Sequence, residues 1–215
     1  MTSLKITDIK QGVKNENRVN VFVNSKYAFS LDISQVVDFR IKIGLEITEA
    51  QLEEYKRASE FGKLYQRTLE WVLTRPHSTQ ETKDYLYRKT RTISQKTQSP
   101  VNNLTAISHD IIERLTMKGY LNDEKFAKYY VENRFVKKGI SKKRLKLELM
   151  KKGVDRTIID EVLSENSRND EEEIKKIILK KRARYDDEKL VNYLVRQGFD
   201  FELARNLVRA SCETD

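Results

Sequence analysis

Apolar and polar residues alternate along the first 31 residues of the chain with the period of two that is typical of β-strands. The apolar positions form three runs: Leu4, Ile6 and Ile9; Val19, Val21 and Val23; Tyr27, Phe29 and Leu31. Polar, turn-forming residues at 11–17 and 24–26 separate these runs. The pattern predicts a small antiparallel sheet.

Helix signals follow the predicted sheet. Asp32 stands at the N-cap of a short apolar segment, and Gly44 then breaks the chain. Thr48 and Gln51 have the spacing of a capping box, which predicts another helix. We therefore expect residues 1–60 to form a β-rich module with a linking helix.

From Lys63 onward the apolar period is that of α-helices, and one pattern occurs three times. Each occurrence has a polar N-cap, a basic helix that ends in Leu, and an apolar residue before a further helix. The occurrences are Ser78, Leu86, Thr90, Ile107, Ile111, Ile112 and Leu115; Ser141, Leu149, Gly153, Val154, Ile158, Ile159, Val162 and Leu163; and Asp186, Leu194, Gly198, Phe199, Leu203, Ala204, Leu207 and Val208. The last two are 45 residues apart at every element. Such self-similarity is typical of helical repeats that bury their apolar faces against neighbours.

The repeats predict three units of three helices each. Repeat 1 covers residues 61–121 with a polar loop inserted at 91–106, repeat 2 covers 122–167, and repeat 3 covers 168–215. Burying one large apolar side chain contributes about 1.5–3 kcal/mol, so a unit of this size is marginal without its neighbours. The expected fold class is mainly α: an elongated array of three tandem three-helix repeats, preceded by a small β-rich N-terminal module.

Caps and glycines mark the expected helix ends. We expect Asp123 and Ser141 to cap helices of repeat 2. Gly153 and Gly198 follow basic helices, where a left-handed helix stop penalises any residue with a Cβ. Thr90 lacks that freedom, so we expect the insertion after it to replace the tight stop.

The positive charge is concentrated in the repeats. The formal net charge is +9, yet residues 1–60 carry nine Lys or Arg and nine Asp or Glu. Residues 61–215 carry 33 basic and 24 acidic residues. Hydrophobic residues make up 38% of the chain and charged ones 35%, which favours an elongated body. A basic helical array is typical of proteins that bind polyanions or acidic protein surfaces.

Two basic stretches are candidate binding sites. The first contains the single acid Glu148, and the second contains none. A solvated helix face is the alternative, but like charges at helical spacing cost a few tenths of a kcal/mol each without a counter-charge. The candidate residues are Arg134, Lys137, Lys138, Lys142, Lys143, Arg144, Lys146, Lys151 and Lys152 in the first stretch, and Lys175, Lys176, Lys180, Lys181, Arg182 and Arg184 in the second. Four tyrosines among them are either core residues or platforms for stacking bases: Tyr129, Tyr130, Tyr185 and Tyr193.

Residues that could support catalysis are scarce. His77 and His109 are 32 residues apart with no cysteine nearby, and we expect exposed turn and helix residues rather than metal ligands. The seven glycines are too widely spaced for a phosphate-binding loop or a dinucleotide motif. The acidic runs 170–173 and 186–188 open predicted helices, where carboxylates complement the helix dipole. The sequence predicts no enzyme, no metal site and no cofactor.

The compartment follows from what the sequence lacks. Cys212 is the single cysteine, which excludes an intramolecular disulfide. There is no apolar run of about 18 residues and no charged-then-apolar leader at Met1, so we expect neither a membrane span nor a secretory signal. We expect a soluble protein of a reducing compartment, the cytoplasm.

Five segments occur in a specific order along the repeats: Tyr120–Ala127, Asn133–Arg134, Lys138–Ser141, Leu149–Val154 and Gln197–Asp200. Each motif alone is typical of many helix ends, whereas their joint order is specific. That order, over about 150 residues from Lys63 onward, resembles the RecX regulatory proteins. The β-rich leader resembles the longer N-terminal module of some family members, whereas the insertion at 91–106 departs from a compact first unit.

The resemblance implies a bacterial cytoplasmic protein that modulates the RecA recombinase. Family members lie along the groove of the RecA filament on single-stranded DNA, bridge neighbouring protomers, and reduce ATP hydrolysis, strand exchange and filament growth; some bind DNA directly. We therefore expect a non-enzymatic, monomeric regulator of recombination and repair. A stand-alone DNA-binding repeat protein and a scaffold for another acidic partner are the alternatives.

Overall fold

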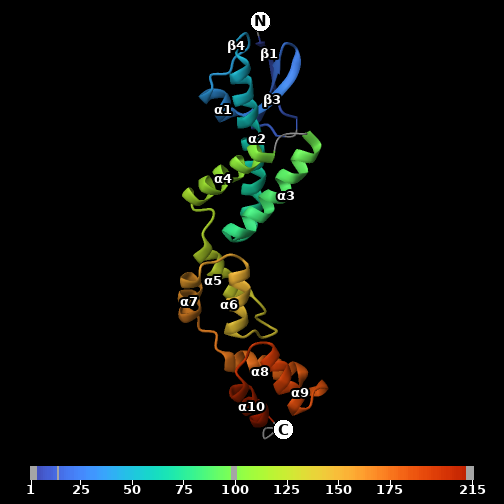
Figure 1. The fold of residues 1–215 in the computed structure, drawn as a ribbon, viewed down its shortest axis with the longest axis vertical. Helices are drawn as coiled ribbons and strands as arrows, with labels where there is room; N and C mark the ends of the chain where they lie inside the picture. Colours follow the sequence, from blue (N-terminus) through green and yellow to red (C-terminus); the bar gives the residue numbers. More distant parts are fainter. Residues whose placement is uncertain (1–3, 14, 98–100, 212–215) are drawn as a thin grey trace. The chain divides into compact units, whose positions relative to one another are not determined.

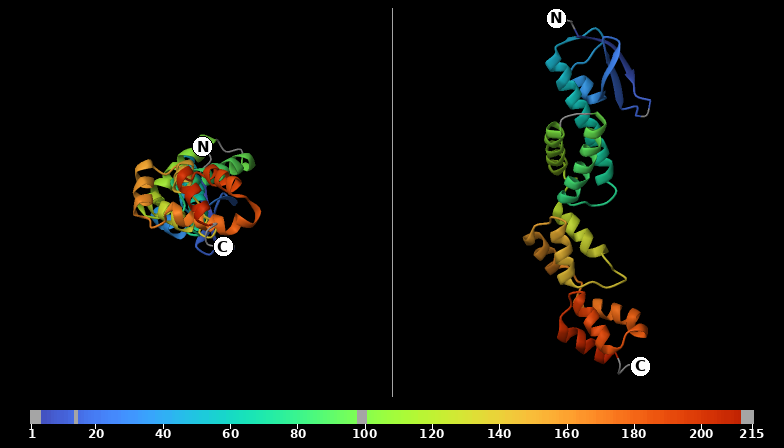
Figure 2. Two further views of the ribbon diagram at one scale, coloured as in Figure 1. Left: turned by 90° about the horizontal axis from the view of Figure 1, so that it is seen from below. Right: turned by 45° about the vertical axis from the view of Figure 1, so that its right-hand side comes forward.

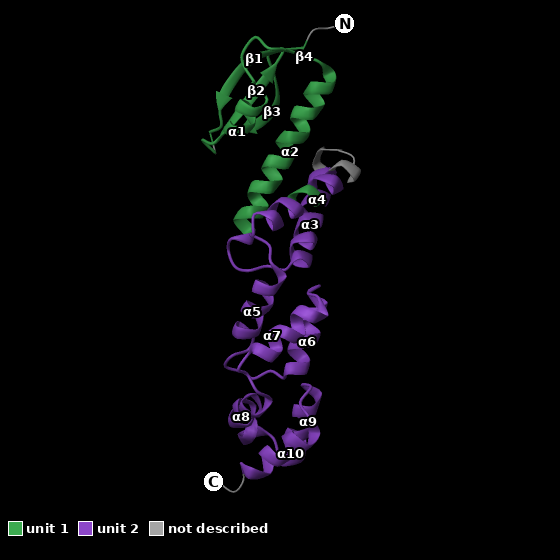
Figure 3. Ribbon diagram, turned by 90° about the vertical axis from the view of Figure 1, so that its left-hand side faces the viewer, with its two compact units in different colours: residues 1–71, 109–111 green, residues 72–108, 112–215 purple. Residues whose placement is uncertain are grey.

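The computed structural model describes residues 4–13, 15–97 and 101–211. They divide into two compact units, shown in Figure 3. Unit 1 contains the residues up to Trp71 together with His109–Ile111, and unit 2 contains the others.

Unit 1 is built on a four-stranded antiparallel sheet (Figure 1). Its strands are β1 (Leu4–Gln11), β2 (Arg18–Val23), β3 (Lys26–Asp32) and β4 (Glu46–Ile47), in the order β3-β2-β1-β4. Asn24 and Ser25 form the two-residue turn between β2 and β3 with positive φ angles of 48° and 66°. Two positive φ values suit the right-handed twist of a tight hairpin. The sheet predicted from the alternating pattern is confirmed.

Two helices complete unit 1. Helix α1 (Ile33–Asp38) begins with a capping box between Asp32 and Gln35, and α2 (Glu49–Val72) begins after Thr48. Tyr55 of α2 packs against Phe29 of the sheet with ring centroids 5.6 Å apart. The module boundary predicted between residues 60 and 61 lies inside α2.

Among its described residues, unit 2 contains helices and connecting turns but no strand. Its α-helices are α3 (Thr79–Thr97), α4 (Val101–Met117), α5 (Asp123–Asn133), α6 (Lys142–Lys151), α7 (Arg156–Glu165), α8 (Asp170–Lys181), α9 (Asp187–Arg196) and α10 (Phe201–Ala210), and a 3-10 turn, Arg182–Arg184, joins α8 to α9. The mainly α class with a β-rich N-terminal module is therefore confirmed.

The polar loop predicted at 91–106 is wrong. Helix α3 continues to Thr97 and α4 already begins at Val101, so most of that range is helical. No Gly or Pro occurs between residues 91 and 97, and the hydroxyl of Thr90 donates to the carbonyl of Leu86, 3.0 Å away within the helix. The prediction failed because Ser, Thr and Gln are common both in loops and on the exposed surface of helices. Pro100 lies outside the described residues.

Repeats 2 and 3 are three-helix bundles (Figure 2). Each bundle has an apolar core of its own. The core of α5, α6 and α7 contains Phe126, Ala127, Val131, Ile140, Leu145, Leu149, Val154, Ile159, Val162 and Leu163. The core of α8, α9 and α10 contains Ile174, Ile177, Ile178, Leu190, Leu194, Phe199, Ala204 and Val208. The repeat pattern in the sequence predicted part of each core: Leu149, Val154, Ile159, Val162 and Leu163 in repeat 2, and Leu194, Phe199, Ala204 and Val208 in repeat 3.

Most helix ends are where the capping residues predict them. Ser141 and Asp186 cap α6 and α9, and Gly153 has the positive φ of a helix stop, 75°. The prediction for α5 is wrong by one residue. Asn122 is the cap, because its side chain accepts a hydrogen bond of 2.8 Å from the amide of Lys125.

Candidate polyanion-binding surface

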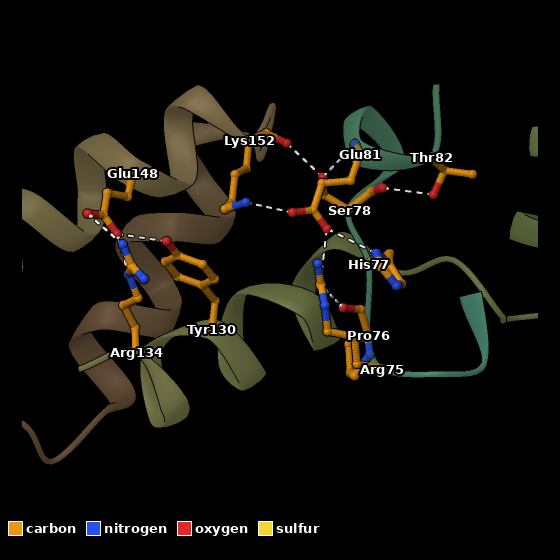
Figure 4. Close-up of polar contacts among 10 residues, drawn as sticks. All are labelled: Arg75, Pro76, His77, Ser78, Glu81, Thr82, Tyr130, Arg134, Glu148 and Lys152. Atoms are coloured by element: carbon orange, nitrogen blue, oxygen red, sulfur yellow. Dashed lines mark hydrogen bonds and ion pairs between the residues drawn. The ribbon is translucent and has the colours of Figure 1, made fainter. Parts of the chain in front are cut away.

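The cap of α3 also joins repeat 1 to repeat 2, as Figure 4 shows. The Ser78 hydroxyl accepts from the Glu81 amide at 3.0 Å and donates to the carbonyl of Lys152 at 2.8 Å. The adjacent amide of Thr79 donates to the Asp123 carboxylate at 2.7 Å. Asp123 therefore serves the junction instead of capping α5.

Equivalent hydrogen bonds join repeat 2 to repeat 3. The Ser141 hydroxyl donates to the carbonyl of Gln197 at 2.7 Å, and the amide of Lys142 donates to the Asp170 carboxylate at 2.9 Å. A Cβ on Gly198 would lie 2.9 Å from the Ser141 hydroxyl, and one on Gly153 would lie 2.6 Å from Gln80 Cβ. These glycines are thus required by the junctions as well as by their φ angles.

Glu173 does more than complement the dipole of α8, because its carboxylate also contacts repeat 2. Its residue is 1% exposed, and its carboxylate accepts from the Ile140 amide at 3.0 Å. It also pairs with Arg168 at 3.3 Å and Lys176 at 2.7 Å. The acidic start of α8 therefore holds repeat 3 against repeat 2.

Six of the fifteen candidate cations have acidic partners within unit 2. Their charges are largely neutralised there, so these residues stabilise the bundles and their junctions. The pairs are Arg134 and Arg144 with Glu148, Lys146 with Asp160, Lys152 with Glu81, Lys176 with Glu173, and Arg182 with Asp187.

Glu148 is the centre of one such network (Figure 4). Burial by itself would raise its pKa, but hydrogen bonds from Arg134 at 2.8 Å and the Tyr130 hydroxyl at 2.7 Å lower that pKa to about 2. Burial and the hydrogen bond to Glu148 raise the pKa of Tyr130 to about 12. Tyr130 is therefore a structural residue rather than a stacking platform.

The other nine candidate cations form no ion pair with any residue that the structure describes. They are Lys137, Lys138, Lys142, Lys143, Lys151, Lys175, Lys180, Lys181 and Arg184. All but Lys142 and Lys181, which are half-buried, are exposed. They are the cations that unit 2 leaves available to an external anion.

A pocket of about 470 Å³ brings the two basic stretches together. Lys138 and Arg144 line it from repeat 2, and Lys180 and Lys181 line it from repeat 3. Other lining residues are Phe135, Gly139, Ile140, Ile177, Tyr193 and Gln197. Lys175 borders a different, apolar groove with Leu179, so not all of the predicted cations share one face.

The aromatic rings near the pocket are already covered by cations. Lys181 Nζ lies 4.4 Å from the ring centre of Tyr193 and 5.1 Å from that of Tyr185, and the two rings are 5.9 Å apart. The guanidinium of Arg134 lies 3.8 Å from the ring centre of Phe135. This arrangement presents charge, rather than open ring faces, to a ligand.

Comparison with known proteins places this architecture in a family. The chain is 34% identical over 206 residues to the regulatory protein RecX of Bacillus subtilis, across 92% of this chain and 74% of that protein. The chain belongs to the RecX family of regulatory proteins. The RecX protein of Bacillus licheniformis is 31% identical over the same shares. The resemblance found in the sequence is thereby confirmed.

Two RecX family models match separate parts of the chain. The model of the RecX N-terminal domain matches residues 4–48, which include the whole sheet of unit 1. The model of the second three-helix domain of RecX matches residues 122–163, the bundle of α5, α6 and α7. A crystal structure of a regulatory protein RecX has the same fold, with a TM-score of 0.66, 23% identity and coverage of 93% of this chain and 96% of that one.

His77 of this RecX-family chain is buried, and the expectation of an exposed turn residue is wrong. Its side chain is 2% exposed, and Nδ1 lies 3.1 Å from the Glu81 carboxylate. The Glu81 carboxylate also forms ion pairs with Arg75 at 3.1 Å and Lys152 at 2.5 Å (Figure 4). His109 is exposed, as expected.

The structural findings about metals and membranes apply only to the described residues. Within them, no three or more His, Cys, Asp or Glu side chains gather as a metal site would require. None of the described helices combines the length and the apolar character that crossing a membrane demands. Cys212 lies outside the described residues.

Proposed function

We propose that this chain modulates the RecA recombinase by binding along the groove of the RecA filament on single-stranded DNA. It inhibits ATP hydrolysis, strand exchange and filament growth in DNA recombination and repair, and it acts in the cytoplasm as a monomer. Membership of the RecX family over 92% of the chain is the observation that carries this proposal.

The charge distribution of unit 2 supports a polyanionic or acidic partner. Nine candidate cations form no ion pair with a described residue, and the pocket joins cations of two repeats. A nucleoprotein filament offers both phosphates and acidic protein surface to such cations.

A binding role, rather than catalysis, fits the surroundings of Glu81 and Glu148, whose pKa values are both lowered, in spite of burial, by hydrogen bonds from basic residues. Glu81 and Glu148 hold helices or repeats together through Lys152, Arg134 and Arg144. Their displaced pKa values have a structural cause, so they do not indicate an acid or base poised for catalysis.

Co-sedimentation tests the proposal against its alternatives. The chain is mixed with RecA filaments on single-stranded DNA, with the same DNA alone, or with RecA alone. Binding to filaments that exceeds binding to bare DNA supports the proposal. Equal binding to bare DNA, with a slope of log K against log salt near about −0.7 for each phosphate contacted, supports a stand-alone DNA-binding protein. Binding to neither DNA nor filament contradicts both.

The structure decides which lysines should be changed. Arg144 and Lys146 are paired within unit 2, so their removal would also disturb the fold. The triple variant K137A/K142A/K143A removes cations that form no ion pair with a described residue. The variant K83A/K118A/K125A removes the same charge elsewhere, because these lysines are exposed and form no ion pair with a described residue. We expect only the first variant to lose filament affinity, by about tenfold or more.

A further inference from the structure

The pocket between repeats 2 and 3 combines features that a solvated helix face does not have. It is concave, and it gathers four cationic side chains from α6, α8 and the turn that precedes α6. Its volume of about 470 Å³ lies in the range of small-ligand sites.

The cations of this pocket differ in their freedom to bind a ligand. Arg144 lies 3.3 Å from Glu148 through Nε and donates another guanidinium hydrogen bond to the side-chain oxygen of Gln197. Lys138, Lys180 and Lys181 form no ion pair with a described residue, although Lys180 donates a hydrogen bond to the carbonyl of Lys137 and the other two lie over aromatic rings. The pocket therefore offers three ammonium groups and a guanidinium that is already held in place.

The wall of the pocket includes an unfavourable backbone conformation. Phe135 has a φ of 48°, a left-handed value that a bulky residue rarely adopts. Backbone outliers of this kind cost about 1–3 kcal/mol and are concentrated at binding and switch sites. The neighbouring glycine, Gly139, has no room for a Cβ, which would lie 2.5 Å from the Glu173 carbonyl oxygen.

We propose that this pocket binds a phosphate group of a nucleotide, held by Lys138, Lys180 and Lys181. Ammonium groups act as point charges that bind phosphate oxygens from several directions. A carboxylate is best matched by a free guanidinium fork, and the fork of Arg144 is occupied by Glu148 and Gln197. The covered rings of Tyr193 and Phe135 favour recognition of the phosphate over stacking of the base.

This inference rests on the proposed function only for its setting, in which the phosphate belongs to the DNA strand of the filament. The binding itself requires no recombinase. A strand and a free nucleotide supply the same chemical group, so the experiment must distinguish these two sources.

Calorimetric titration of the whole chain, without RecA, tests the proposal. The probes are an oligothymidylate, ATP, inorganic pyrophosphate and, as the acidic-protein control, a poly-glutamate peptide of similar charge. The variants are K138A/K180A/K181A and the charge-matched K83A/K118A/K125A. We expect the pocket variant to bind phosphate probes at least about tenfold more weakly, and the matched variant to bind like the original chain.

The titration results either support the phosphate-binding proposal or overturn it. Binding of the oligothymidylate alone assigns the pocket to a strand, and binding of ATP and pyrophosphate as well assigns it to free phosphates; both support the proposal. No binding of any phosphate probe, preference for poly-glutamate, or equal losses in the two variants overturns it.

A second measurement does not depend on the stability of a variant. Amide chemical shifts of the original chain are followed by NMR while pyrophosphate or oligothymidylate is added. The proposal expects the largest changes at Lys138, Gly139, Lys180 and Lys181, and changes spread evenly over basic residues contradict it. If RecA inhibition fails while these shifts appear, the proposed function is wrong and the pocket stands; the reverse result removes only the pocket.

Discussion

At the scale of single residues, the fifteen candidate cations fall into two groups: those that form ion pairs within the fold and those that do not. The sequence predicted all of the basic residues as one class, whereas the structure separates paired from unpaired ones. Lys152 and Glu81 are 71 positions apart, and no local pattern could have paired them. The burial of His77 was missed for another reason: its partner Glu81 is only four positions away, but a histidine next to a proline gives no apolar pattern that marks it as buried. Composition thus predicted that the repeats are basic, but not which basic side chains can bind an external anion.

Glu148 makes the stability of repeat 2 depend on pH. Its pKa is lowered from the ordinary value of 4.5 to about 2, so its stabilising contribution is complete above pH 4.5 and is lost as the pH falls toward 2. We expect E148Q to lower the free energy of unfolding by about 1–2 kcal/mol at neutral pH and to remove much of this acid-side slope. Urea unfolding at several pH values measures both effects.

Glu165 provides the control for that prediction. It is an exposed carboxylate that pairs with Lys128 at 3.3 Å. We expect E165Q to change stability by less than about 0.5 kcal/mol. An E148Q curve that runs parallel to that of the original chain over the acid range contradicts the role assigned to Glu148.

At the scale of elements, capping residues and glycines located most helix ends correctly. They did so because an N-cap hydrogen bond and a positive φ are local requirements that the residue itself satisfies. The predicted loop at 91–106 failed because polar composition does not end a helix, and residues 91–97 contain no Gly or Pro that would break α3. The junction contacts of Ser78 and Ser141 were not predicted, because each joins residues more than 50 positions apart.

Gly119 and Gly139 have similar positive φ angles, but only Gly139 lies at a junction between repeats. Replacing each by alanine therefore distinguishes the destabilisation caused by backbone strain from that caused by a clash at the junction. Gly119 has a φ of 73° with no atom within 4 Å of the position that a Cβ would take, whereas Gly139 has a φ of 83° and faces Glu173 and Ile177. We expect G119A to cost about 1 kcal/mol and G139A about 1–3 kcal/mol more. Equal losses in urea unfolding would show that repeat 3 does not press on Gly139.

Ser141 can be changed so that the cap remains while the junction is lost. An aspartate caps a helix as well as serine does, but its carboxylate cannot donate to the Gln197 carbonyl. We therefore expect S141D and S141A each to lower the free energy of unfolding by about 1–3 kcal/mol. S164A, which removes an exposed hydroxyl, is the control and should have little effect. A fully stable S141D chain contradicts the junction role.

At the scale of the whole molecule, the family could be inferred from the order of motifs, and its identity is confirmed by relatives such as the Bacillus subtilis protein. The pocket could not be inferred. It requires Lys138 of one bundle and Lys181 of the next to meet, and that meeting depends on the Ser141 junction. The basic stretches are thus visible in the sequence as two separate features, and only the fold joins them.

We propose that this chain inhibits RecA through cations that form no ion pair within its own fold. Titration of the ATPase activity of RecA on single-stranded DNA measures this inhibition directly. We expect progressive inhibition by the original chain and by K83A/K118A/K125A, and inhibition that requires about tenfold more of K137A/K142A/K143A. Unchanged ATPase activity at saturating amounts of the folded original chain, or equal inhibition by both variants, would contradict the account.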